Sequence, residues 1–186
     1  MWRLVVKLSL PFRMVLLSES LAGAGKSKMI VAVLGGGKIG EAVAKRISQS
    51  KGVSKVIMTK RNISTIQHLV SPKLEVTINN LDAGRKADLI IISVKAGDAR
   101  SLLKGISRFT SGKIVISLMA AVSIKNLQSA LPRAKIVRSM PNIAATIGEA
   151  ITAYSPAPGL SKKELDDVES VLGCFGDYIQ IPESLM

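Results

Sequence analysis

The chain has 186 residues, which is enough for one full domain and a short remainder. Hydrophobic residues make up 47% and aromatic residues only 3%, so the core must be built from aliphatic side chains, as in buried parallel strands. The net charge of +13 favours anionic partners, but the cations are scattered without interleaved aromatic residues, which argues against specific nucleic-acid binding.

Residues 1–28 form a basic segment that differs from the rest of the chain. It carries five Lys or Arg residues against one acid, and charged residues and a proline interrupt the apolar runs that a secretory signal needs. The stretch 23–27 (GAGKS) ends like a phosphate-binding loop, but Ser20 stands where that motif requires a glycine. We expect an ill-ordered extension or a start codon assigned too far upstream, with Met29 as the natural beginning. No apolar run is long enough to span a membrane, so we expect no membrane partner and a cytoplasmic location.

From residue 29 onward, apolar runs alternate with amphipathic segments. The apolar runs predict strands at 29–34, 55–59, 74–77, 88–94, 113–118, 135–139, 151–154 and 177–181. The amphipathic segments predict helices at 39–50, 63–70 and 98–108, one between Ser123 and Pro132, and one opened by a capping box of Ser161 and Glu164. This alternation predicts the α/β class, as a doubly wound, Rossmann-type, mostly parallel sheet in a single domain at 29–182.

A glycine loop, Gly35-Gly36-Gly37-Lys38-Ile39-Gly40, lies between the first predicted strand and the first predicted helix. In this context the pattern G-x-G-x-x-G is typical of dinucleotide-binding proteins. Gly35 permits the tight turn, Gly37 lets backbone amides approach a pyrophosphate, and Gly40 lets the helix pack against the strand. The loop therefore predicts a site for the pyrophosphate of a nicotinamide cofactor. The alternative is a glycine-rich turn without a ligand.

The turn after the second predicted strand indicates which cofactor is bound. Thr59, Lys60 and Arg61 stand where NAD-binding proteins usually have an acid that binds the ribose 2′-hydroxyl. A hydroxyl and two cations can bind and neutralise a 2′-phosphate, whereas a carboxylate would repel it. The turn favours NADP(H), and a solvated basic turn is the alternative. Two further loops, 93–97 and 118–121, follow strands where ligands bind in open α/β sheets.

Four segments occur in the order found in pyrroline-5-carboxylate reductases, and the chain from 29 to 186 resembles that family. They are the strand and loop at 29–40, the SVKAGD loop, the SLMAAVSIKNLQ segment, and the stretch 138–149 (RSMPNIAATIGE). The last is the most telling, since it is similar to the family's R-x-M-P-N segment followed by G-E. The resemblance implies NADPH-dependent reduction of the cyclic imine pyrroline-5-carboxylate to proline.

The resemblance also implies places for individual residues. Those at the pyrophosphate would be Gly35, Gly37, Lys38, Ile39 and Gly40; those at the adenosine phosphate Thr59, Lys60 and Arg61; those flanking the cofactor Val94 and Lys95; and those bordering the nicotinamide Ala120, Met140, Pro141 and Asn142. Lys95 and the last three are the candidates beside the substrate. No metal is expected, because the only cysteine, Cys174, and the only histidine, His68, form no ligand cluster.

Two departures from the family's pattern limit what the resemblance implies. Asn142-Ile143-Ala144 stands where the family commonly has Asn-Thr-Pro, so a hydroxyl and a rigid residue are missing beside the nicotinamide. The residues 182–186 form a helix-start signal where the family continues into an all-helical domain, which supplies the dimer interface of the homo-oligomer and much of the imine pocket. We expect 183–186 to begin that domain and the rest of it to be missing, which could leave the chain inactive toward a small-molecule imine.

Three alternatives fit the same sequence. The first is a related NADP-dependent reductase of another imine or of a keto acid, or a deazaflavin-linked reductase, because a fold alone does not fix the substrate. The second is a non-catalytic NADP-binding module or a fragment. The third is nucleic-acid binding driven by the net charge of +13, which predicts a steep salt dependence of the affinity for DNA.

Overall fold

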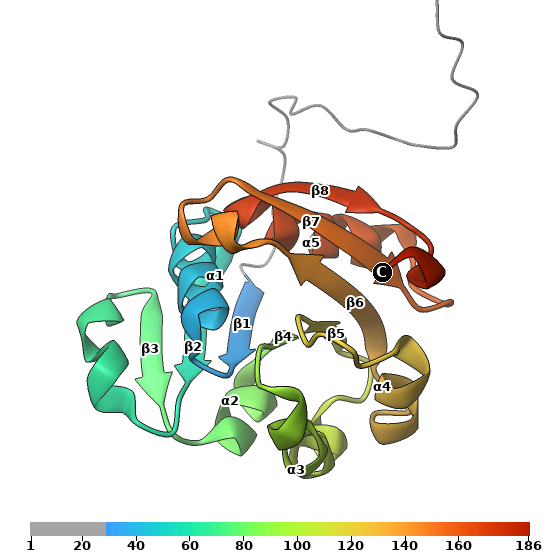
Figure 1. The fold of residues 1–186 in the computed structure, drawn as a ribbon. Coiled ribbons are helices and arrows are strands. Elements are labelled where there is room, and N and C mark those ends of the chain that lie inside the picture. Colours follow the sequence, from blue (N-terminus) through green and yellow to red (C-terminus); the bar gives the residue numbers. More distant parts are fainter. Residues whose placement is uncertain (1–28) are drawn as a thin grey trace, which may run out of the picture.

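The computed structural model describes residues 29–186, which contain one sheet with helices on both faces (Figure 1). The expected extension and the rejected phosphate-loop match, at 1–28, lie outside the described residues. The strands are β1 (Met29–Leu34), β2 (Val53–Thr59), β3 (Leu74–Thr77), β4 (Leu89–Ile92), β5 (Ile114–Ser117), β6 (Lys135–Pro141), β7 (Ala150–Pro156) and β8 (Gly176–Gln180). The α-helices are α1 (Lys38–Ser48), α2 (Asn80–Lys86), α3 (Ala96–Ile106), α4 (Ile124–Ala130) and α5 (Lys162–Leu172). The 3-10 helices are η1 (Ile63–Leu69), η2 (Ser107–Phe109), η3 (Ile143–Thr146), η4 (Gly173–Phe175) and η5 (Glu183–Leu185).

The sheet has the strand order β3-β2-β1-β4-β5-β6-β7-β8. The first six strands of the chain, β1 to β6, all pair in parallel with one another. β7 pairs antiparallel with β6, and β8 pairs parallel with β7, so the last two strands run against the other six. The predicted doubly wound, mostly parallel sheet is confirmed. The strand order reverses between β1 and β4, as it does in a Rossmann fold.

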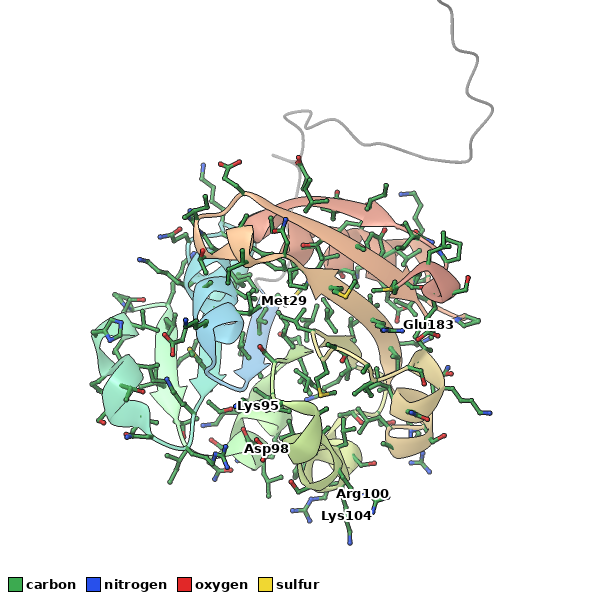
Figure 2. All side chains as sticks on the ribbon, viewed as in Figure 1. Met29, Lys95, Asp98, Arg100, Lys104 and Glu183 are labelled. Atoms are coloured by element: carbon green, nitrogen blue, oxygen red, sulfur yellow. The ribbon has the colours of Figure 1, made fainter. Side chains whose placement is uncertain are left out.

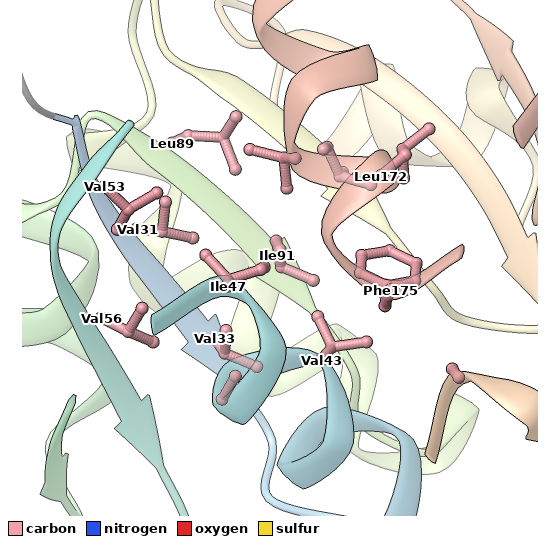
Figure 3. Close-up of a cluster of buried hydrophobic side chains, with 14 of the residues drawn as sticks. Val31, Val33, Val43, Ile47, Val53, Val56, Leu89, Ile91, Leu172 and Phe175 are labelled. Carbon is pink, nitrogen blue, oxygen red and sulfur yellow. The ribbon is translucent and has the colours of Figure 1, made fainter. Parts of the chain in front are cut away.

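Two apolar cores lie on opposite faces of the sheet, because its central strands are aliphatic on both sides. All four residues of β4 are buried. One core joins residues such as Val31 and Ile91 to α1 and α5, with Phe175 beside them (Figure 3). The other core joins sheet residues such as Ile90 to the apolar sides of α2, α3 and α4, for example to Leu103 in α3. Since helices cover both faces, the ends of the strands are the parts of the sheet left open for a ligand.

The segments around β3 differ from the sequence-based expectation. α2 was not predicted, and the predicted helix at 63–70 is a 3-10 helix. α2 has only seven residues, with Gly84 among them, so its apolar pattern is too short to be recognised from periodicity. It is instead fixed at its start by Asn79, whose side-chain oxygen accepts hydrogen bonds from the backbone N–H groups of Leu81 and Asp82.

The last described residues are tied to the sheet by Glu183, which Figure 2 labels beside β6. Its carboxylate accepts hydrogen bonds from the backbone N–H of Ile124 at 2.7 Å and from Nη1 of Arg138 at 3.1 Å. These contacts join η5 to the first turn of α4 and to β6. The expected role of 183–186 as the beginning of a further domain stays a prediction. No helix within residues 29–186 is both long and apolar enough to cross a membrane.

Candidate functional site

The carboxyl ends of β1 and β4 meet where the strand order reverses, which is where ligands bind in open α/β sheets. A cavity of about 860 Å³ opens there, a volume within the usual range for small-molecule and cofactor sites. The residues of the lining that the sequence predicted are Gly35, Gly37, Thr59, Lys60, Arg61, Val94 and Lys95. The residues of the lining that it did not predict include Asn79, Asn80 and Leu81 at α2, and Asp98, Ser101 and Leu102 in α3.

The glycine loop makes the close contacts that its motif predicts. Gly35 has a φ of +111°, and a Cβ at that position would lie 2.5 Å from the carbonyl oxygen of Ser93. A Cβ on Gly40 would overlap the carbonyl oxygen of Gly35, so α1 can begin against the loop only with glycine there. A Cβ on Gly37, in contrast, would meet no atom within 4 Å, and no side chain caps α1. The amino end of α1 therefore opens toward the cavity, as in helix N-termini that bind anions.

Thr59 ties three segments together beneath the cavity. Its side chain is buried, and its hydroxyl accepts a hydrogen bond from the backbone N–H of Gly35 at 3.2 Å. The same hydroxyl donates to Oδ1 of Asn80 at 2.5 Å, at the start of α2. A hydroxyl has one proton to donate, and this one is used within the protein. The contact of Thr59 with the adenosine phosphate stays a prediction, and in this structure its hydroxyl links the glycine loop to α2.

The two cations of the basic turn have partners that lie far away in the sequence. Nζ of Lys60 lies 2.7 Å from Oε1 of Glu41, in the first turn of α1. Nη2 of Arg61 lies 3.3 Å from Oδ2 of Asp98, in the first turn of α3. The turn itself contains no acid, as the sequence indicated, but the fold brings two carboxylates to it. The paired residues are 19 and 37 positions apart in the sequence, so no local pattern predicts these ion pairs.

The loop after β4 forms the wall opposite the basic turn. The backbone N–H of Ser93 donates to the carbonyl of Leu34 at 2.8 Å, which holds this loop beside the glycine loop. Lys95 is the N-cap of α3, and it lines the cavity together with Val94. Lys95 and Asp98 lie on the side of α3 nearest the end of β1 (Figure 2).

The remaining predicted residues are outside the described cavity lining: Lys38, Ile39, Gly40, Ala120, Met140, Pro141 and Asn142. The first three form the first turn of α1, directly after Gly37. The others follow β5 or lie at the end of β6, at the same edge of the sheet, because β4, β5 and β6 are parallel neighbours. The side chain of Met140 is exposed, and Oδ1 of Asn142 accepts a hydrogen bond from the backbone N–H of Ile151 at 3.3 Å. Their contact with a nicotinamide stays a prediction.

The clearly raised pKa values belong to groups outside this cavity. Burial raises the pKa of Tyr154, whose hydroxyl also donates to Glu169 at 2.6 Å. Burial raises the pKa of Cys174 as well. Within residues 29–186 no three His, Cys, Asp or Glu side chains lie together as possible metal ligands. The cavity offers a ligand backbone N–H groups, amide side chains and cations, together with the carboxylate of Asp98.

Comparison with known proteins gives a consistent picture for this region. Residues 30–121, which contain the glycine loop and both walls of the cavity, match the family described as NADP oxidoreductase, coenzyme F420-dependent. Pyrroline-5-carboxylate reductase 1 of Dictyostelium discoideum is 32% identical over 168 residues, which cover 82% of this chain and 30% of that protein. The pyrroline-5-carboxylate reductase of Methanosarcina acetivorans is 34% identical over 115 residues, which cover 61% of this chain and 43% of that protein. The chain thus spans less than half the length of these two relatives.

A solved structure has the same fold. The NADP-bound pyrroline carboxylate reductase of Plasmodium falciparum superposes with a TM-score of 0.75 at 23% sequence identity. The superposition covers 86% of this chain and 60% of that chain. At this level of identity the likeness establishes the shared fold. A fold alone does not identify the ligand, which depends on the residues of the cavity.

Proposed function

This chain belongs to the pyrroline-5-carboxylate reductase family, matching the N-terminal part of its members, and we propose that its cavity binds NADP(H). The observation that carries this proposal is the glycine loop at the β1–β4 switch point, where the amino end of α1 opens toward the cavity at Gly37. We assign residues 29–182 to this cofactor-binding domain. The bound cofactor would serve the reduction of pyrroline-5-carboxylate, the substrate in the names of the relatives.

The residues of the cavity fit the chemical groups of this cofactor. The pyrophosphate would lie against Gly35 and Gly37, where backbone N–H groups and the helix dipole favour negative charge. The basic turn and the start of α2 would hold the adenosine, and Arg61 would bind the 2′-phosphate. Lys60 and Thr59 support this end of the site through their contacts with Glu41 and Gly35. Val94 and Lys95 flank the cofactor from the opposite wall.

The reduction itself asks little of ionisable side chains. When bound, NADPH would supply a hydride to the carbon of the protonated imine, whose C=N double bond would become a C–N single bond and leave the amine and NADP⁺. The protein must hold the nicotinamide and the imine in line and exclude water, so positioning and electrostatics dominate. Ala120, Met140, Pro141 and Asn142 border the nicotinamide in this proposal, since they follow β5 or lie at the end of β6, at the edge that continues from the cavity.

The test combines cofactor titration with an activity assay on the same preparation. We expect the protein to bind NADPH with a lower dissociation constant than NADH. The activity assay measures the oxidation of NADPH in the presence of pyrroline-5-carboxylate. The double variant Lys60→Ala with Arg61→Ala should weaken NADPH binding by about tenfold or more and NADH binding much less, because only NADPH carries the 2′-phosphate. Equal losses for the two cofactors would make the pair a surface turn only. Absence of binding to either cofactor would refute the proposal.

A non-catalytic NADP-binding module is the second candidate, because the described cavity lining contains residues proposed for the pyrophosphate and the 2′-phosphate but none of the four proposed to border the nicotinamide. Tight cofactor binding without turnover would support that function, and clear turnover would exclude it. A deazaflavin-linked reductase is a third candidate, since the matching family carries that name. Hydride transfer from NADPH to an oxidised deazaflavin, or from a reduced deazaflavin to NADP⁺, measured with the same protein, separates this activity from imine reduction.

A further inference from the structure

The two ion pairs of the basic turn differ in how firmly each cation is held. Lys60 is fixed at both ends of its side chain. Its Nζ lies 2.7 Å from Glu41, and these two side chains are only 27% and 30% exposed. Its stem packs on the glycine loop, since a Cβ on Gly36 would lie 2.9 Å from Cβ and Cδ of Lys60. Lys60 therefore braces the loop against α1, and a ligand would have to break both contacts to recruit its charge.

Arg61 is held loosely by comparison. Its side chain is 91% exposed and its ion pair consists of a single contact, from Nη2 to Oδ2 of Asp98 at 3.3 Å. A guanidinium has five N–H donors, so most of its hydrogen-bonding capacity is open to another anion. Exposed pairs of this kind contribute little, whereas a phosphate can accept two parallel hydrogen bonds from one arginine. An arriving phosphate can therefore displace the carboxylate.

The Arg61–Asp98 pair also reaches across the cavity. Arg61 follows β2 on one wall, and Asp98 lies in the first turn of α3 on the other; both belong to the lining. Asp98 is the one acidic residue in the described lining, which also contains three cations, Lys60, Arg61 and Lys95. Figure 2 shows Asp98 on the inner side of α3, whereas Arg100 and Lys104 point away from the cavity. Its carboxylate is thus placed to act on a ligand in the cavity and not only on the surface of the helix.

We propose that Asp98 is a specificity-determining residue, whose carboxylate competes with the 2′-phosphate of the cofactor for Arg61 and so limits the preference for NADPH over NADH. The inference rests on the proposed function, because it concerns the same cofactor site. It divides the basic turn into a fixed cation, Lys60, which positions the glycine loop, and a displaceable cation, Arg61, which reads the phosphate. A carboxylate on the helix opposite the turn therefore sets the selectivity of a site whose turn contains only cations.

The experiment measures the affinities of the full chain for adenosine 2′,5′-bisphosphate and for adenosine 5′-monophosphate, with NADPH and NADH alongside. In Asp98→Asn we expect the two ligands with a 2′-phosphate to bind about three- to fivefold more tightly, and the other two to change less than twofold. In Arg61→Gln the 2′-phosphate ligands should weaken by about tenfold or more. Adding Asp98→Asn to Arg61→Gln should then bring no gain, because the competitor acts only through that guanidinium.

A matched control is available on the far side of the sheet. Lys162 pairs with Asp166 at 3.0 Å on α5, and their side chains are 82% and 44% exposed, close to the 91% and 45% of Arg61 and Asp98. Asp166→Asn changes the net charge by the same amount and should leave all four affinities within twofold. Asp98→Ser repeats the test with a residue that is well tolerated in a first helical turn, should Asp98→Asn fold poorly.

Several results would overturn the inference while the proposed function stands. One is tight NADPH binding that Asp98→Asn leaves unchanged. Another is an equal gain for ligands with and without the 2′-phosphate, which would mean that Asp98 acts on the shared pyrophosphate. A third is an equal gain in Asp166→Asn, which would make the effect one of net charge. Failure of the wild type to bind any of the four ligands would instead refute the proposed function, and the inference with it.

Discussion

At Gly37 and Gly40, three residues apart in one motif, an added side chain would meet opposite surroundings. Replacing Gly40 by Ser puts a Cβ against the backbone carbonyl of Gly35 and should lower the free energy of unfolding by about 1–3 kcal/mol. Replacing Gly37 by Ser puts the Cβ in open space at an extended N-cap position that serine favours, so stability should change by less than about 0.5 kcal/mol. Gly37→Ser should nevertheless weaken dinucleotide binding by about tenfold or more, because the added atoms occupy the space in front of the loop. Urea denaturation and cofactor titration of both variants separate packing from binding. A loss of stability in Gly37→Ser as large as that in Gly40→Ser would contradict the binding role of Gly37.

Thr152 is a buried residue whose hydroxyl has no hydrogen-bond partner among the described residues. A buried polar group without a partner costs free energy that an apolar group of the same shape does not. Thr152→Val should therefore raise the free energy of unfolding by about 1 kcal/mol. Thr110→Val is the matched control, because Thr110 is equally buried and its hydroxyl donates to the carbonyl of Ser107 at 2.9 Å. That change should lower stability by a similar amount, and a loss in both variants would mean that Thr152 has a partner.

Among the elements, α5 begins with a capping box that contains a titrating carboxyl group, that of Glu164. The predicted capping box is confirmed: Ser161 accepts from the backbone N–H of Glu164, and the Glu164 carboxylate accepts from the backbone N–H of Ser161 at 2.7 Å. That backbone hydrogen bond, and then the Ser161 hydroxyl, hold the pKa of Glu164 below its ordinary value of 4.5. A lowered folded-state pKa means that the stabilisation is present above pH 4.5 and is lost as the pH falls through the folded-state pKa.

Glu164→Ala should therefore cost about 0.5–1 kcal/mol at neutral pH, and this difference from the wild type should shrink in acid. Glu164→Gln serves as the control, because a glutamine can keep the reciprocal hydrogen bond without a titrating group. Its difference from the wild type should likewise diminish below pH 4.5. Denaturation curves at several pH values measure both. A cost of Glu164→Ala that stays constant down to strongly acidic pH would contradict the sign of the shift.

The elements that the sequence predicted correctly are those whose pattern is long or chemically marked. β4 is a continuous aliphatic run, α1 follows a glycine motif and α5 begins with a capping box, so each could be recognised locally. α2 could not, because seven residues with a glycine among them give no reliable period, and only its asparagine cap marks it. The reversal of β7 relative to β6 has no local signature either. It follows from how the chain between them packs, which is a tertiary property.

At the scale of the whole molecule, the sequence predicted the part of the site that one βαβ unit builds, and not the part that the fold assembles. The glycine loop, the basic turn and the loop after β4 were found because each directly follows a strand. Glu41 and Asp98 were not, because an acid in the first turn of a helix is common and only the folded chain brings the first turns of α1 and α3 to the basic turn. The sequence therefore favoured a purely basic 2′-phosphate site, whereas the structure has a basic turn that is paired with acids.

The net charge of +13 belongs to the same scale, because it acts on any anion that approaches the cavity. A 2′-phosphate adds about 1.5–2 negative charges to the cofactor, so NADPH should feel this field more than NADH. Raising the salt concentration from about 0.1 M to about 1 M shortens the Debye length from about 10 Å to about 3 Å. NADPH affinity should then fall by at least about threefold more than NADH affinity. Titrations of both cofactors at the two salt concentrations measure this, and in Arg61→Gln the difference should narrow, since the contact at the phosphate is lost. An equal salt dependence of the two cofactors in the wild type would mean that the phosphate binds without help from the charge of the protein.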